Sequence, residues 1–174
     1  MAGRVYILCG LPFAGKSTLA RELAARLGWT HLEVDAIHRE RGQGLHGEQL
    51  SRQSWIDAYR EAYRRLDELL RDQRTVLYDA TNFRRAQRQR ARQIAARHGA
   101  TACVLYVTTP AMAAQQRLHQ NRQLPARADV HDIDFAAVAA QFQPPTADED
   151  MLQYNGAAPV AVWIADTFGQ AAAQ

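Results

Sequence analysis

Short apolar runs alternate along the chain with longer segments in which apolar residues recur every three or four positions. The short runs are typical of buried strands and lie at 4–9, 30–34, 75–78, 102–107 and 159–164. The segments with one apolar face are typical of helices and lie at 16–27, 48–72, 83–97, 111–120 and 135–142. Strands that alternate with helices predict a mainly parallel sheet covered on both faces. The pattern therefore predicts an α/β protein with five strands.

Length and composition narrow the class of protein. A chain of 174 residues fits one domain, expected at 1–168, followed by a frayed tail at 169–174. The content of 47% hydrophobic residues supports a buried core, and no apolar run approaches the roughly 20 residues that span a bilayer. Cys9 and Cys103 lie in apolar runs, which indicates two buried thiols. With no signal-type cleavage pattern, these features favour a cytoplasmic location.

The single lysine of the chain lies in its most informative segment. The run Gly10-Leu11-Pro12-Phe13-Ala14-Gly15-Lys16-Ser17 fits G-x-x-x-x-G-K-S, after a predicted strand and at the start of a predicted helix. Backbone N–H groups of such a loop surround phosphate oxygens, and the lysine reaches the β- and γ-phosphates. The Ser17 hydroxyl is a ligand for Mg²⁺, and Thr18 ends the expected binding segment. The segment predicts a site for a nucleoside triphosphate.

Other classes of phosphate-loop protein fit the chain less well. GTPases carry an N-K-x-D motif, and this chain has no second lysine to make one. Transporter and AAA-type ATPases carry signature segments or a second subdomain, which 174 residues hardly accommodate. The small kinase class remains, in which one chain supplies both lid arginines and an acceptor site.

Several motifs together resemble the polynucleotide-kinase-like P-loop kinases, small kinases related to the 5′-kinase domain of phage polynucleotide kinase. The resemblance runs from residue 4 to about 165 and is carried by the loop at 10–17, Val34-Asp35-Ala36-Ile37, Asp79-Ala80-Thr81-Asn82, the segment from Gln116-Arg117 to Arg122, and a late F-x-P-P-T-x-D-E stretch at 142–149. It implies a P-loop kinase fold of the nucleoside-kinase type with a small helical lid. It also implies ATP and Mg²⁺ as cofactors, with adenine preferred to guanine.

The resemblance also implies roles for residues at two strand ends. Asp35 matches an aspartate that acts as general base on the acceptor hydroxyl. The family commonly has an arginine three residues later to hold the acceptor, where this chain has His38 with Arg39 beside it. Asp79 would hold Mg²⁺ through water, and Thr81 and Asn82 would shape the acceptor pocket. Capping of a loop or helix is the alternative role for these aspartates and their neighbours.

Arginines after the fourth strand are candidates for the lid. Arg117 and Arg122 lie where such kinases carry the residues that stabilise charge on the γ-phosphate, and Arg127 is a reserve candidate. Ordinary surface arginines are the alternative interpretation.

Charge is unevenly distributed along the chain. Residues 60–97 contain eleven arginines against five acids, whereas the chain after Arg127 has seven acids and no lysine or arginine. Arg85, Arg88 and Arg92 form one stripe of a predicted helix, which is either a track for nucleic acid or, as we favour, a solvated face. The aromatic stripe that begins at Trp55 is expected in the core rather than as a stacking platform. The histidines show no metal-ligand spacing.

Three functions remain open on these grounds. The favoured one is a kinase that phosphorylates a hydroxyl of a small molecule. The alternatives are a polynucleotide 5′-hydroxyl kinase and a nucleotide-binding switch or interaction module with little turnover. In each case ATP and ADP are the expected partners, no membrane is involved, and for the kinases a hydroxyl-bearing acceptor is required.

Overall fold

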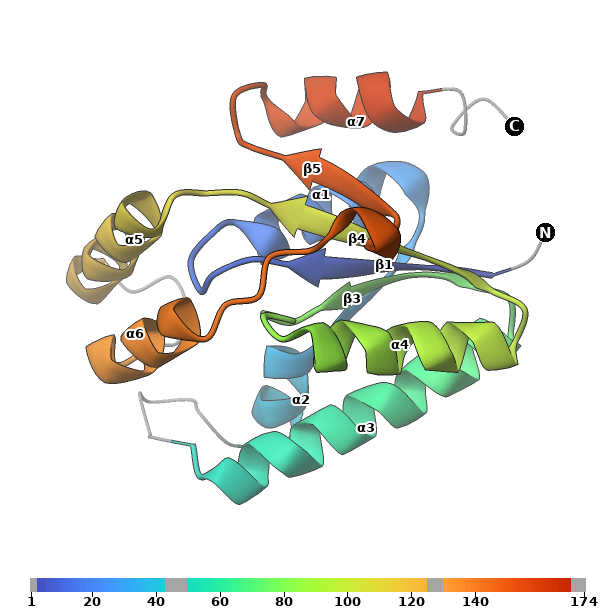
Figure 1. The fold of residues 1–174 in the computed structure, drawn as a ribbon, viewed down its shortest axis with the longest axis horizontal. Helices are drawn as coiled ribbons and strands as arrows, with labels where there is room; N and C mark the ends of the chain where they lie inside the picture. The colour runs from blue at the N-terminus through green and yellow to red at the C-terminus, as the bar shows by residue number, and fades with distance from the viewer. Residues whose placement is uncertain (1–2, 43–49, 125–129, 170–174) are drawn as a thin grey trace.

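A twisted parallel sheet forms the centre of the protein (Figure 1). The structure is a computed structural model and describes residues 3–42, 50–124 and 130–169. Its strands are β1 (Arg4–Cys9), β2 (Thr30–Glu33), β3 (Thr75–Asp79), β4 (Thr101–Val107) and β5 (Met151–Tyr154). They pair in the order β2-β3-β1-β4-β5, and every pairing is parallel. The predicted α/β class with five strands is confirmed.

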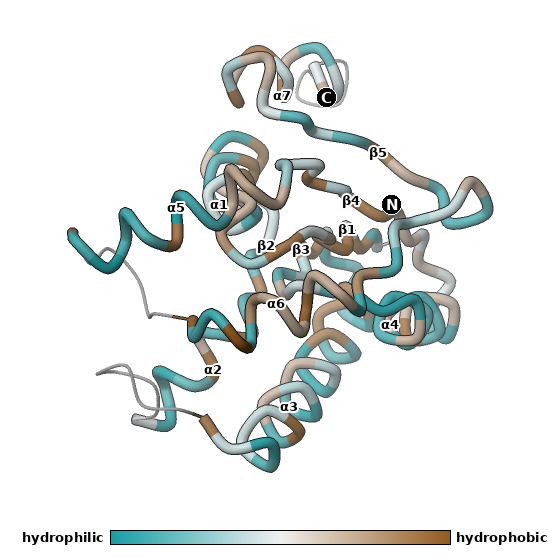
Figure 2. Tube along the Cα trace, turned by 60° about the vertical axis from the view of Figure 1, so that its left-hand side comes forward, coloured by the Kyte–Doolittle hydropathy of each residue, from teal (hydrophilic) through white to brown (hydrophobic). Residues whose placement is uncertain are grey.

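Helices cover both faces of this sheet, as the strand-helix alternation predicts. They are α1 (Lys16–Leu27), α2 (Val34–Glu40), α3 (Arg52–Arg71), α4 (Arg85–Arg97), α5 (Ala111–Gln123), α6 (Asp132–Ala140) and α7 (Val160–Phe168). Val5 and Ile7 of β1 face a core shared with α2, α3 and α4, whereas Tyr6 and Leu8 face a second core shared with α1 and α7. Figure 2 shows apolar residues on the central strands and hydrophilic residues along the outer parts of α3 and α4. None of the described helices is long and apolar enough to cross a membrane.

The helices α5 and α6, called here the lid helices, lie beyond the carboxyl ends of the strands (Figure 1). They share a small apolar cluster, in which Ala114 and Leu118 of α5 meet Phe135 of α6 and Phe13 of the loop after β1. Phe13, which belongs to the loop at 10–17, thus packs in the same apolar cluster as the lid helices. This cluster ties the lid helices to the strand-loop-helix unit at the start of the chain.

The prediction for the fifth strand is wrong. Residues 159–164 were expected to form it, yet they begin α7, and the fifth strand is Met151–Tyr154 within the expected acidic loop. Val160, Ile164 and Phe168 recur every four residues and pack onto the α1 face of the sheet. Val160, Val162 and Ile164 also alternate as in a strand, so residues 159–164 alone fit either element. The helical spacing becomes clear only when Phe168 is included.

Several predicted boundaries shift by a few residues. The second strand ends at Glu33, so that Asp35 lies in the first turn of α2. The long helix begins at Arg52 after Ser51, whose hydroxyl accepts a hydrogen bond from the Ser54 amide, while the predicted start at 48–49 lies outside the described residues. The helix expected at 135–142 spans Asp132–Ala140. Residues 170–174 of the expected tail also lie outside the described part of the chain.

Both cysteines are buried free thiols, as predicted. Burial raises the pKa of Cys9 and of Cys103 to about 11 in each case. The two thiols therefore stay protonated near neutral pH and act as small apolar side chains of the core.

Candidate active site

The loop between β1 and α1 has the backbone shape of a phosphate cradle. Phe13 and Gly15 have φ angles of 61° and 103°, and Gly15 is the N-cap of α1. Left-handed residues in such a loop turn successive N–H groups toward one concave side, which suits an anion. The Lys16 side chain is 7% exposed, and its Nζ donates to the Leu11 carbonyl at 2.7 Å across the loop. The segment thus has the geometry that its sequence motif predicts.

A cavity of about 620 Å³ opens beside this loop at the carboxyl ends of the strands. Lys16 and Ser17 line it from the loop, Asp35 lines it from α2, and Asp79 and Thr81 line it from the end of β3. Pro12 of the loop lines it too, so six predicted site residues from three separate segments line one cavity. The ends of parallel strands meet at one edge of a sheet, which is where α/β proteins bind ligands.

Two carboxylates at neighbouring strand ends are already held by basic side chains. Glu33 and Asp79 are paired in register on β2 and β3, and both line the cavity. An oxygen of Glu33 lies 2.6 Å from the Arg39 guanidinium. The buried Asp79 carboxylate lies 2.9 Å from Nε2 of His31. Arg39, predicted to contact the acceptor, instead pairs with a residue of the cavity wall.

His31 is a site residue that the sequence analysis did not identify. Residues 31 and 33 project from the same face of β2 because side chains alternate along a strand, and this places His31 beside Asp79. The sequence signal was the i, i+2 spacing of His31 and Glu33 in a strand next to the one that ends in Asp79. It could be used only once strand order and register were known.

The residues present fit a magnesium ion that is held mainly by phosphate and water. Among the described residues no group of three or more His, Cys, Asp or Glu side chains could hold a metal. Ser17 and Asp79 line the same cavity, however, and supply one hydroxyl and one carboxylate. Mg²⁺ keeps several waters and takes one or two protein oxygens beside substrate phosphates. Ser17 and Asp79 are the candidates for that role.

We expect His31→Leu to weaken the response to Mg²⁺ without unfolding the protein. The imidazole orients the Asp79 carboxylate, and loss of such an outer partner typically costs about 10–100-fold in metal affinity or activity. The Mg²⁺ concentration for half-maximal nucleotide binding, measured by titration, should rise accordingly, and His31→Gln should restore part of the effect. An unchanged Mg²⁺ titration in His31→Leu would contradict this positioning role.

Two other residues predicted to contact the acceptor lie outside the cavity. Asn82 is fully buried and donates from Nδ2 to the Leu8 carbonyl at 2.7 Å, so it joins the end of β3 to β1. His38 is buried against α3, where its ring meets Trp55 edge-on at 4.4 Å between centroids. Neither residue is among those that line the cavity. Position 38 turns inward because α2 packs on α3.

The two candidate lid arginines have different surroundings. Nη1 of Arg117 lies 3.1 Å from the Ala14 carbonyl and 3.4 Å from that of Phe13, directly at the phosphate loop. Arg122 instead bonds to Asp132 at 3.1 Å and to the Val130 carbonyl at 2.8 Å, so it joins the two lid helices. Arg127 lies outside the described residues. Of the predicted pair, only Arg117 is placed at the loop.

The arginine stripe of α4 is exposed at one residue and buried at another. Arg88 is fully buried and forms a two-pronged ion pair with Glu149, with both N–O distances at 2.8 Å. Arg85 pairs with Asp148, and Arg92 donates to the Asp148 carbonyl at 3.4 Å. The hydrogen bonds from Arg88 lower the pKa of Glu149 below its usual value. The stripe thus pairs with Asp148 and Glu149, and the expectation of a solvated face is wrong at the buried Arg88 but holds at the exposed Arg85.

The aromatic stripe of α3 is divided between core and cavity. Leu66 and Leu70 are buried, as predicted, whereas Trp55 is 36% exposed and lines the cavity together with Tyr59. The expectation that the whole stripe belongs to the core is therefore wrong at its N-terminal end. That end of α3 extends past the edge of the sheet, where no strand covers it (Figure 1).

A parallel sheet in this order, with a phosphate loop after the first strand, defines a P-loop nucleotide-binding fold. The chain belongs to the AAA_33 family of AAA domains, whose model matches residues 5–145. No curated protein sequence matches the chain.

Solved structures confirm the fold. The chain is similar to Kti12 of Chaetomium thermophilum in complex with ADP-AlF3, with a TM-score of 0.73, 19% identity, and coverage of 98% of this chain and 100% of that one. It is similar to a sugar kinase of Janibacter sp. HTCC2649 (TM-score 0.68, 17% identity, 96% and 93% covered). It is also similar to the APS kinase CysC of Mycobacterium tuberculosis in complex with AMPPNP and APS (TM-score 0.65, 16% identity, 97% and 96% covered).

Proposed function

We propose that the protein is a single-domain, cytoplasmic kinase that transfers the γ-phosphate of ATP to a hydroxyl of a small molecule, with Mg²⁺ as its metal. One observation carries the proposal. Lys16 and Ser17 of the phosphate loop line the same cavity as the Asp35 carboxylate. A phosphate donor and an acceptor hydroxyl therefore have room to meet between them.

Each residue has a distinct part in the proposed reaction. The loop at 10–18 binds the phosphates of ATP, and Lys16 contributes a compact positive charge at the β- and γ-phosphates. Ser17 and Asp79 would hold Mg²⁺, which would neutralise phosphate charge when bound. Asp35 orients the acceptor hydroxyl and accepts its proton, and Arg117 offsets charge on the transferred group. Arg122 serves to join the lid helices.

A small acceptor is favoured over a nucleic acid by the charge pairing around α4. The arginines that would follow a polynucleotide backbone are engaged by Asp148, Glu149 and the carbonyl of Asp148. Lid helix α6 also lines the cavity, which narrows the space for a long chain. Resemblance to the polynucleotide-kinase-like group is the argument for the alternative acceptor, a 5′-hydroxyl of nucleic acid.

The proposal predicts that Asp35→Asn abolishes most transfer while ATP still binds. Loss of a positioned general base should lower kcat by about 10²–10⁴-fold. Transfer of label from γ-labelled ATP is measured with a pooled metabolite extract and with a 5′-hydroxyl oligonucleotide. Asp72→Asn, an exposed carboxylate at the end of α3, is the matched control and should retain wild-type activity.

The outcomes separate the three functions. Label on a small molecule, lost in Asp35→Asn but kept in Asp72→Asn, supports the proposal. Label on the oligonucleotide would establish the polynucleotide kinase instead. If ATP binds with normal affinity and no acceptor gains label, the protein is a nucleotide-dependent switch and the catalytic assignment fails.

A further inference from the structure

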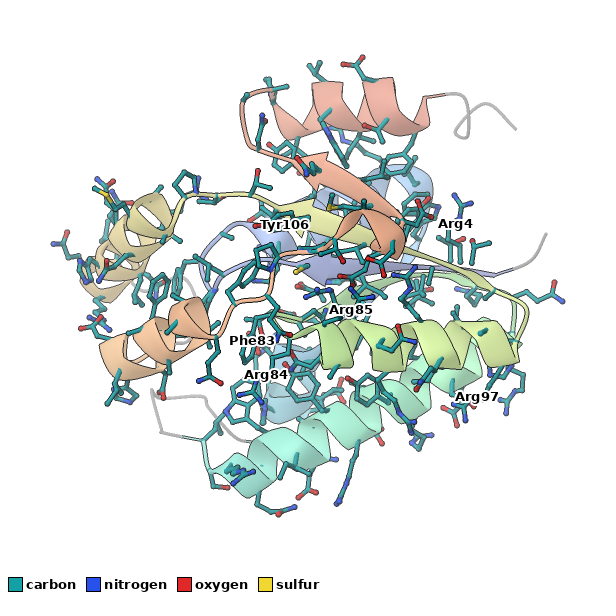
Figure 3. All side chains as sticks on the ribbon, viewed as in Figure 1. Arg4, Phe83, Arg84, Arg85, Arg97 and Tyr106 are labelled. Carbon is teal, nitrogen blue, oxygen red and sulfur yellow. The ribbon has the colours of Figure 1, made fainter. Side chains whose placement is uncertain are left out.

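The cavity that Asp35 lines also has aromatic lining residues, which the proposed phosphate transfer does not use. Trp55 and Tyr59 of α3 and Phe83 at the end of the β3 segment all line it. The rings of Trp55 and Tyr59 lie 6.3 Å apart between centroids, and the buried His38 ring packs edge-on against Trp55 at 4.4 Å. Figure 3 shows Phe83 and Arg84 together at the start of α4. Three aromatic side chains from two segments thus line one cavity, and they are called here the aromatic wall.

Lid helix α6 and the residue after it supply a second wall, which includes the small apolar side chains of Ala137 and Val138. Asp134, Ala137, Val138 and Gln141 line the cavity, and their spacing of three and four places them on one helix face. This wall is fixed to the aromatic side, because the Gln143 amide donates to the Phe83 carbonyl at 2.8 Å and Arg84 bonds to Gln141. An aromatic wall and a wall of small side chains together suit a planar ring.

Two arginines line the same cavity beside these walls. The Arg84 guanidinium lies 5.2 Å from the centre of the Phe83 ring. Arg52, the first residue of α3, makes no side-chain hydrogen bond or ion pair within 3–42, 50–124 and 130–169. Glu33 and Asp79, which also line the cavity, are bonded to Arg39 and His31. Guanidinium groups bind carboxylate and phosphate through two hydrogen bonds, which makes them selective for such groups.

We propose that the acceptor is a small hydroxyl compound with a planar ring and one anionic group, a carboxylate or a phosphate ester. Its ring lies between the aromatic wall and α6, its anionic group binds Arg52 and Arg84, and its hydroxyl faces Asp35. This inference rests on the kinase function proposed above. In the transfer the acceptor oxygen forms a bond to the γ-phosphorus, the bond from that phosphorus to the β,γ-bridging oxygen breaks, and the hydroxyl proton passes to Asp35 and then to water. The products are ADP and the phosphorylated acceptor.

The charge part of the proposal is tested by binding, independently of turnover. The probes are 4-(hydroxymethyl)benzoate, 4-(hydroxymethyl)phenyl phosphate and the neutral benzyl alcohol, titrated calorimetrically into the protein with Mg-ADP. Either anionic probe should bind about 10–100-fold more tightly than benzyl alcohol, as expected for hydrogen bonds between charged groups. The tighter of the two identifies the source of the anionic group. Equal binding of all three probes, or binding of none, would overturn the proposal.

Variants connect this preference to the named residues. Arg52→Gln and Arg84→Gln should each remove most of the advantage of the anionic probes, whereas Arg71→Gln, an exposed arginine at the other end of α3, should leave it unchanged. Trp55→Ala should weaken all three probes, and Trp55→Phe should restore binding. Glycolate, an anion without a ring, should bind worse than the benzoate. An unchanged preference in both arginine variants would overturn the assignment.

The labelled product from the metabolite extract separates this inference from the kinase function. A product that absorbs in the ultraviolet and carries a carboxylate or a phosphate of its own, in addition to the transferred phosphate, supports both. A product whose only anionic group is the transferred phosphate, or a product without a ring, would overturn the acceptor class and leave the kinase intact. If no acceptor gains label, the kinase function itself fails and the acceptor class fails with it.

Discussion

Replacement of Arg117 by glutamine is expected to lower kcat by about 10³–10⁵-fold, the range found for arginines that offset charge on a transferred phosphoryl group. The side chain is held at the phosphate loop by the carbonyls of Phe13 and Ala14, and a Cβ on Gly15 would lie 3.5 Å from its Nη1. Nucleotide affinity should change far less, because the loop amides and Lys16 still bind the phosphates. Single-turnover transfer and equilibrium binding of ATP, measured together, separate the two effects.

Arg122→Gln is the matched control for this prediction. Its guanidinium bonds to Asp132 and to the Val130 carbonyl, at the junction of the lid helices, and not to the loop. We expect it to lower activity by less than about tenfold, through a less ordered lid. Equal losses in the two variants, or an Arg117→Gln activity within tenfold of wild type, would show that Arg117 does not act on the transferred group.

The second large effect concerns stability. Arg88→Leu is expected to lower the free energy of unfolding by about 3–5 kcal/mol, because it leaves the Glu149 carboxylate buried without its partner. It also removes the donor to the carbonyls of Asn82 and Gln143, at 3.0 and 2.9 Å. Urea unfolding followed by circular dichroism measures the loss. Arg85→Gln, which breaks the exposed pair with Asp148, should have little effect.

The same ion pair sets a dependence of stability on pH. Arg88 lowers the pKa of Glu149 in the folded state, so the carboxylate contributes stability above its ordinary pKa near 4.5, and this contribution is lost as pH falls through the folded value. The stability difference between wild type and Glu149→Gln should therefore shrink below about pH 4. A difference that stays constant from pH 7 to pH 3 would contradict the role of the charged pair.

Local patterns were sufficient to predict the parts of this protein that depend on neighbours in sequence. The loop at 10–17 and the helix that Gly28 ends with a φ of 67° are encoded in consecutive residues. The presence of Asp35 and Asp79 in one site could also be predicted, because each comes after an apolar run and the carboxyl ends of parallel strands meet at one edge of the sheet. The fifth strand was missed, since Met151–Tyr154 is short and lies in a polar segment.

Features that depend on contacts between distant segments were out of reach. The partner of Arg88 is Glu149, 61 residues away, and nothing near either residue indicates the pairing. His31 contacts Asp79 only through the register of β2 and β3. His38 follows Asp35 by one helical turn, yet the packing of α2 on α3 turns it into the protein. Sequence patterns alone therefore identify site residues within a local motif more readily than site residues whose contacts depend on the tertiary structure.

The position of the lone lysine has a practical consequence for spectroscopy. Lys16 is the only lysine in the sequence, and it lies within the phosphate loop with its amine bonded to the Leu11 carbonyl. A sample grown with ¹⁵N-labelled lysine would give a single backbone amide resonance, from the first residue of α1. That resonance would report on occupancy and on conformational exchange at the loop, without assignment of the rest of the spectrum. Because Lys16 is the only lysine, a lysine label would report selectively on the phosphate loop.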